Sequence, residues 1–208
     1  MRGETTIKLV KMCAAAVLAF GVSVGTAFAT VIDFGGLAGA NGAAFSSYSQ
    51  AGFTVNATAG SWFEAHNFGN PVPSIFAGPI GSPSLSTVRV TDGGSDFTFA
   101  AVDFSSNNGS STYSIQGLLN GIIVLNMSGT TGGFPGPWNT VSNGSGTPTI
   151  DELLLTLIPI GGTTSMNLDN INVSTVVNPA PEPATLTLLV FGLGALGFSR
   201  RKRAKVVS

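Results

Sequence analysis

The sequence has almost no cysteine. Its one thiol, Cys13, lies in an apolar stretch near the start, and no cysteine follows it. Disulfides, thiol catalysis and cysteine-based metal sites are therefore excluded for the rest of the chain. Stability must come from buried apolar side chains, with a bound metal ion as the other available aid.

Positive charge is also scarce once the two ends are set aside. Of the nine Lys and Arg residues, three lie in residues 1–29 and five in residues 200–205, which leaves Arg89 as the only base between them. Eight acidic residues lie in residues 30–176, which contain only this one base, so the net charge of these residues is −7 although that of the whole chain is −1. An acidic surface disfavours nucleic acid and anionic membranes as partners, and it is compatible with divalent cations.

Signatures of catalysis are missing as well. The chain has a single histidine, His66, and contains neither a Gly-x-Ser-x-Gly motif nor a phosphate-binding loop. Glu64 and His66 would share one face of an extended segment, close enough to hold a metal, but a structural or surface histidine is the simpler interpretation. Asp151 and Glu152 are interpreted as the solvated start of a strand. We assign no catalytic residue.

Residues 1–29 have the pattern of a secretory signal peptide. Arg2, Lys8 and Lys11 form a positive start, an apolar core follows, and Ala27 and Ala29 occupy the small-residue positions of a cleavage site. We predict export through the Sec machinery and cleavage after Ala29. An uncleaved anchor is the alternative.

The C-terminal end has three parts in a fixed order. Pro181, Glu182 and Pro183 come first, and residues 184–199, which carry no charge, form an apolar run. Its uninterrupted core, 184–198, would span roughly 22 Å as a helix, and we predict that 184–199 form a transmembrane segment although a bilayer core is about 30 Å thick. A buried core helix is the alternative. Residues 200–208 are the predicted cytoplasmic tail, in which a basic cluster stops transfer: Arg200, Arg201, Lys202 and Arg203.

This tail resembles the PEP-CTERM sorting signal of Gram-negative bacteria. The resemblance implies recognition by a membrane-embedded processing enzyme of the exosortase type, with processing near Pro181, Glu182 and Pro183. It also implies anchoring in the inner membrane during sorting, a final location at the cell surface or outside the cell, and a link to bacteria that produce exopolysaccharide.

Residues 30–176 form the body, which we predict to be one all-β domain, with 177–183 as an extended linker. Apolar and polar residues alternate in short runs bounded by turn residues, and no helical period separates them. Asn120-Gly121 predicts a hairpin turn, and a change of phase within 97–104 predicts a bulge. A β-sandwich or jelly roll follows. The predicted strands are 31–34, 52–57, 87–91, 97–104, 112–117, 121–127, 151–158 and 168–175.

The order of the later strands, closed by Leu168-Asp169-Asn170-Ile171, resembles a jelly-roll module similar to carbohydrate-binding domains. The resemblance implies that Asp169 helps to hold a structural Ca²⁺. Asp92 and Asp96 could also face one cation, although a hairpin loop between two strands is the preferred interpretation of residues 92–96.

Two connections, 68–86 and 129–149, are long and rich in Pro and Gly, and in sandwiches such loops gather where binding sites occur. Trp62 and Trp138 could stack on sugar rings if exposed, and burial is the alternative for both. We therefore predict a non-enzymatic, exported protein that associates with exopolysaccharide or envelope material. The alternatives are a purely structural matrix protein and a secreted hydrolase.

Overall fold

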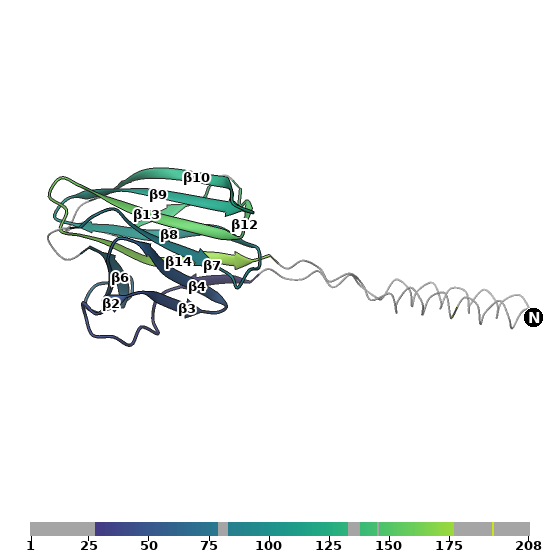
Figure 1. Cartoon of the computed structure of the whole chain (residues 1–208), viewed down its shortest axis with the longest axis horizontal. Coiled ribbons are helices and arrows are strands. Elements are labelled where there is room, and N and C mark those ends of the chain that lie inside the picture. The colour runs from purple at the N-terminus through teal and green to yellow at the C-terminus, as the bar shows by residue number, and fades with distance from the viewer. Residues whose placement is uncertain (1–27, 79–82, 133–137, 145, 177–192, 194–208) are drawn as a thin grey trace, which may run out of the picture. The chain divides into compact units, whose positions relative to one another are not determined.

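The computed structural model describes residues 28–78, 83–132, 138–144, 146–176 and 193. Within them the chain forms two antiparallel β-sheets packed face to face, which confirms the predicted β-sandwich (Figure 1). The eight-stranded sheet contains β1 (Ala29–Ile32), β2 (Ala44–Phe45), β5 (Trp62–Ala65), β6 (Ser74–Ala77), β8 (Phe97–Asn107), β11 (Asn139–Ser142), β12 (Thr149–Ile150) and β14 (Ser165–Thr175). The six-stranded sheet contains β3 (Ser47–Gln50), β4 (Phe53–Ala59), β7 (Ser86–Thr91), β9 (Ser110–Leu119), β10 (Ile122–Thr131) and β13 (Glu152–Ile160).

The eight predicted strands all correspond to strands of the structure, and the chain crosses repeatedly between the sheets, as it does in jelly rolls. One detail of the prediction is wrong. Residues 92–96 do not close a hairpin, because β7 and β8 belong to different sheets. They form a tight turn between the layers, in which the backbone N–H of Ser95 donates to the carbonyl of Asp92 (2.7 Å).

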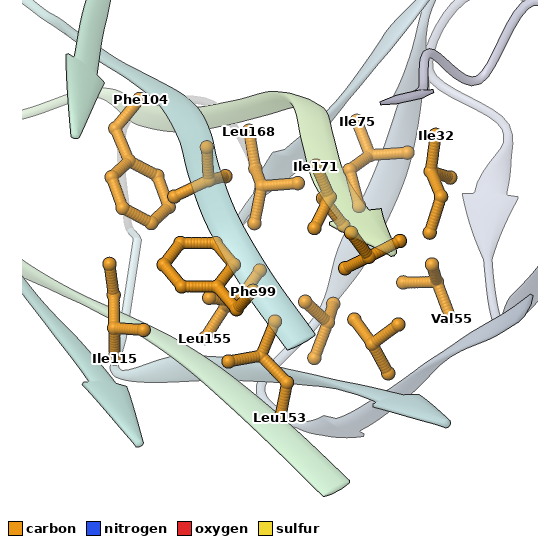
Figure 2. Close-up of a cluster of buried hydrophobic side chains, with 14 of the residues drawn as sticks. Ile32, Val55, Ile75, Phe99, Phe104, Ile115, Leu153, Leu155, Leu168 and Ile171 are labelled. Carbon is orange, nitrogen blue, oxygen red and sulfur yellow. The ribbon is translucent and has the colours of Figure 1, made fainter. Parts of the chain in front are cut away.

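The core lies between the two sheets. Phe99 and Phe104 of β8 and Leu168 of β14 face Ile115 of β9 and Leu155 of β13, and all five are fully buried (Figure 2). Alternation along the strands produces this layer, because every second side chain points inward. Each such side chain contributes about 1.5–3 kcal/mol through burial. The body, residues 27–176, is a compact unit that contains both sheets and this core, so we expect it to fold alone.

Two local signals in the sequence have the expected structures. Asn120 (φ 52°) and Gly121 (φ 76°) form the turn between β9 and β10, where both residues need a positive φ. The predicted bulge in β8 lies at Ala100 and Ala101, where the register with β14 shifts. A second shift, in β14, follows Asp169 and makes Asn170 an extra residue with φ 47°.

Both ends of the body lie on neighbouring strands, since β1 pairs with β14 and Ala29 lies opposite Ser174. Cleavage after Ala29 would leave Thr30, opposite Val173, as the first residue of β1. The rest of the predicted signal peptide, the 177–183 linker, the basic cluster and, apart from residue 193, the predicted membrane segment lie outside the described residues. Within the described residues, no helix has the length and apolar character needed to cross a bilayer.

Candidate functional site

Two buried acidic residues meet on the outer side of the eight-stranded sheet. Asp103 of β8 and Asp169 of β14 are direct cross-strand partners, and their exposed fractions are 5% and 0%. The extra residue Asn170 resets the alternation of β14, so that Asp169 points outward while Leu168 and Ile171 are both in the core. The bulge therefore positions Asp169 for its contact with the segment that covers it.

Hydrogen bonds from three segments hold the two carboxylates. The backbone N–H groups of Asn70 and Asn170 donate to Asp169 (2.7 and 2.8 Å), and the side-chain amides of the same residues donate to Asp103 (3.1 and 2.9 Å). The hydroxyl of Thr140 donates to the other oxygen of Asp103 (2.6 Å). The amide of Asn170 also bonds to the carbonyl of Asn70. We call Asn70, Asp103, Thr140, Asp169 and Asn170 the acidic cluster.

The surroundings of the acidic cluster compensate its negative charge only in part, which changes the pKa of Asp169. Burial raises the pKa of Asp169 to about 7, the backbone hydrogen bonds from Asn70 and Asn170 oppose this rise, and the charges of Asp103 and Asp33 add to it. Its side chains offer carboxylate, amide and hydroxyl oxygens, which are the ligands that Ca²⁺ takes in proteins. The two carboxylates fit the calcium ion expected at Asp169, whereas the amides of Asn70 and Asn170 and the hydroxyl of Thr140 direct hydrogen-bond donors at Asp103. No group of three or more His, Cys, Asp or Glu side chains suited to a metal occurs among the described residues.

An aromatic pair lies next to the acidic cluster. The rings of Phe68 and Trp138 stack with their centroids 5.1 Å apart and at an angle of 25°, and both residues are partly exposed. Asn70 follows Phe68 by two residues, and Thr140 follows Trp138 by two residues, so both segments lead directly into the acidic cluster. The two long connections identified in the sequence thus contact each other on the outer side of the sheet.

The outer faces of the two sheets differ in character. The outer face of the eight-stranded sheet also contains a second stacked pair, Phe63 and Phe76, with centroids 5.3 Å apart. On the six-stranded sheet, Arg89 lies between Asn56 and Leu154 in a row of mostly polar residues, and the two tyrosines of its strands pack against the core. Partly exposed aromatic rings therefore lie on the eight-stranded sheet, next to the acidic cluster.

Trp62, the other tryptophan considered for sugar stacking, is buried. Its exposed fraction is 2%, and its indole N–H donates to the carbonyl of Ala59 (3.2 Å). Because its ring belongs to the hydrophobic core, it offers no face to a sugar. Of the two tryptophans, only Trp138 is placed for that role.

The predicted pair Glu64 and His66 meets, with 2.9 Å between Oε2 and Nε2. The Glu64 carboxylate also accepts the backbone N–H of Gly39 (2.9 Å), and Asn41 accepts the backbone N–H of His66 (2.9 Å). These contacts fasten the connection between β1 and β2 to β5, which is a structural role. Asp151 has a similar role, because its carboxylate accepts the backbone N–H of Asn120 at the β9–β10 turn (2.7 Å).

A groove of about 680 Å³ runs along β10. Residues 124–127 form one side, and Ser142, Asn143 and Thr147 contribute to the other. The described residues that line it include neither an aromatic nor a charged side chain. It can donate and accept hydrogen bonds, but it lacks the flat apolar surface on which sugar rings stack.

Comparison with protein families identifies the tail. The PEP-CTERM protein-sorting motif matches residues 179–203, so the chain carries this sorting signal. The motif implies export, membrane anchoring before processing, and processing by an exosortase. No curated protein matches the chain.

Several solved structures resemble the body at low similarity. The CBM32 of AlyQ in complex with 4,5-unsaturated mannuronic acid is 19% identical, with a TM-score of 0.39 over 64% of this chain and 100% of that one. A mutant of CBM29-2, a family 29 carbohydrate-binding module, is 14% identical, with a TM-score of 0.42 over 72% and 93%. The family 11 carbohydrate-binding module of Lic26A-Cel5E from Clostridium thermocellum is 13% identical, with a TM-score of 0.35 over 76% and 100%.

Proposed function

We propose that the chain is a non-enzymatic, exported surface or matrix protein whose body binds extracellular polysaccharide at Phe68 and Trp138. The observation that carries this proposal is the partly exposed aromatic stack beside the acidic cluster. Aromatic rings bind the apolar faces of sugars, and neighbouring hydroxyl, amide and carboxylate groups bind their hydroxyls. The sorting signal supports the proposal, because it implies export, and extracellular polysaccharide lies outside the cell.

A purely structural matrix role is the main alternative, and hydrolysis is the weaker one. Hydrolysis of a glycosidic bond by the usual route needs two carboxyl groups that face the substrate across a cleft. Asp103 and Asp169 are the two acids that meet, and both are buried beneath hydrogen-bonding partners. His66 bonds to Glu64 rather than to a serine hydroxyl. The geometry supports binding better than catalysis.

Co-sedimentation with polysaccharide tests this proposal directly. The purified body, residues 30–176, is mixed with insoluble matrix polysaccharide from the producing bacterium and centrifuged. We expect the body to enter the pellet and soluble glycan to release it. A folded body that stays in the supernatant at all polysaccharide concentrations favours the structural role.

We further propose that Ca²⁺ binds at the acidic cluster and stabilises the body. Asp103 and Asp169 would supply charged ligands, with oxygens of Asn70 and Thr140 beside them. Such an ion would also fix the two segments that carry Phe68 and Trp138. Calcium would therefore support polysaccharide binding by holding the aromatic stack in place.

Processing of the tail gives a separate prediction. In the variant Glu182→Gln, the proline positions are kept and the negative charge between them is lost. We expect the full-length chain to accumulate in the membrane fraction, as measured by immunoblotting with an antibody against the body. The variant Asp151→Asn, which changes an acid within the body, should be processed normally. Normal processing of Glu182→Gln would show that the carboxylate is not part of the recognised signal.

A further inference from the structure

The edge of the six-stranded sheet is formed by β10, a long strand without the usual protection. A strand at a sheet edge presents unpaired N–H and C=O groups, and proteins commonly shield them with lysine, proline or very short strands. The ten residues of β10 include no charged residue and no proline. A bulge interrupts its pairing with β9 at Val124, and the ladder is regular from Leu125 to Thr131. The outer side of β10 faces the groove described above, and another strand that enters this groove can pair with it.

Apolar side chains are exposed at the start of this edge. The exposed fractions of Ile122, Ile123 and Val124 are 68%, 51% and 43%. Ile122 and Ile123 lie opposite Leu119 and Leu118 of β9, which are themselves only partly buried. These five residues make the hairpin end of β10 apolar on both faces of the sheet.

The charge distribution indicates which partner can approach this edge. Residues 105–150, which include β9 to β12, contain no charged residue, although the body has a net charge of −7. The nearest acid, Asp151, lies at the β9–β10 turn, where its carboxylate accepts the backbone N–H of Asn120 (2.7 Å), and Glu152 lies opposite Leu118 of β9. Two copies of an acidic protein repel each other at most orientations, but contact along β10 brings no charged side chain of either edge strand against the other.

We propose that β10 is a self-association interface, in which two copies pair their β10 strands antiparallel about a two-fold axis. Such an interface uses the same patch on both copies, so the patch must be complementary to itself. An uncharged edge strand meets this condition, because its backbone groups pair with those of an identical antiparallel strand. Pairing joins the two six-stranded sheets into one of twelve strands. An axis near Asn126 lets residues 122–130 of the two strands pair and covers part of the apolar side chains at each hairpin.

The oligomeric state of the body tests this proposal. Sedimentation velocity of residues 30–176 should show a dimer whose fraction increases with protein concentration. The variant Ile123→Asp should remain monomeric at concentrations at which the wild type is dimeric, because it brings two like charges into the interface. Ser49→Asp, on the opposite edge strand β3, is the matched control and should dimerise as the wild type does. Circular dichroism confirms that each variant is folded.

Single cysteines then locate the contact. Since the body has no cysteine of its own, Asn126→Cys should form a symmetric disulfide-linked dimer under mild oxidation, whereas Ser49→Cys should stay monomeric. A wild-type body that is monomeric at all accessible concentrations overturns the proposal. A dimer that Ile123→Asp leaves intact, or that cross-links at position 49 and not along β10, overturns it too. Polysaccharide binding in the co-sedimentation assay is a separate measurement, so either proposal can fail without the other.

Discussion

In the absence of calcium, the free energy of unfolding of the body should fall as the pH rises from about 4 to about 7. The pKa of a free aspartate side chain is 3.8, whereas burial raises the pKa of Asp169 in the folded body to about 7. Between these values the folded state keeps a proton that the unfolded state has released, so a rise in pH favours unfolding. One pKa unit corresponds to about 1.4 kcal/mol, which makes the full loss on the order of 4 kcal/mol. Below pH 4 both states are protonated and the effect vanishes.

The measurement is urea unfolding of residues 30–176 at several pH values with a chelator present. Asp169→Asn removes the titrating group, so its free energy of unfolding should fall less steeply over this range than that of the wild type. Asp151→Asn is the matched control and should keep the wild-type slope. Added Ca²⁺ should restore stability at pH 7–8 in the wild type but not in Asp169→Asn. Parallel pH profiles for wild type and Asp169→Asn would contradict the account of Asp169, and equal melting temperatures with calcium and with chelator would remove the calcium proposal.

The two tryptophans should respond to truncation in opposite ways. Trp62→Ala opens a cavity in the core and should lower the free energy of unfolding by about 3–5 kcal/mol. Trp138→Ala removes a partly exposed ring and should cost much less stability. It should nevertheless weaken polysaccharide binding about 30-fold or more, because loss of a central aromatic contact typically costs about 2 kcal/mol or more.

Urea unfolding measures the first effect and titration with soluble polysaccharide the second. Trp138→Phe serves as a conservative control, since it keeps an aromatic face against Phe68 and should retain part of the affinity. If Trp138→Ala and wild type bind with equal affinity, the aromatic stack is not the binding site, and the groove along β10 becomes the better candidate.

The fold was predictable where the strands are long. In β9, for example, Tyr113 and Ile115 alternate with polar neighbours and show a period of two, and Asn120-Gly121 specifies its own turn. Strands such as β2 and β12, with two residues each, are too short to show a period. In β6 all four residues are buried, so no alternation exists there either. These strands form because neighbouring strands provide backbone hydrogen-bonding partners for them. The local sequence does not indicate that such neighbours are present.

The candidate site was only half predictable. Asp169 and Trp138 could be singled out by motif and residue type, whereas Asp103 could not. Asp103 comes next to Asp169 through pairing of β8 with β14, two strands distant in the sequence, and through a shift of register at Asn170. A local sequence pattern does not specify which residues of two distant strands lie opposite each other. The only local signal was an acidic residue inside the mostly apolar run 97–104, which indicates that a buried carboxylate needs a partner but does not identify that partner.

The C-terminal end of the chain specifies sorting, whereas the body carries the proposed binding surfaces. The PEP-CTERM motif at residues 179–203 specifies a route through the membrane, and it does so independently of what the body binds. The body is a separate compact unit whose first and last strands, β1 and β14, lie side by side. The proposed binding and self-association depend on three of its surface features: the aromatic stack, the acidic cluster and the uncharged β10 edge.

The most direct test of polysaccharide binding is a glycan-array screen of residues 30–176, with and without Ca²⁺, in which Trp138→Ala is screened in parallel. We predict that the wild-type body binds a defined set of glycans, more strongly with calcium, and that Trp138→Ala loses those signals while remaining folded. A folded wild-type body that binds no glycan under either condition would contradict the proposal and leave a structural role in the matrix as the better explanation.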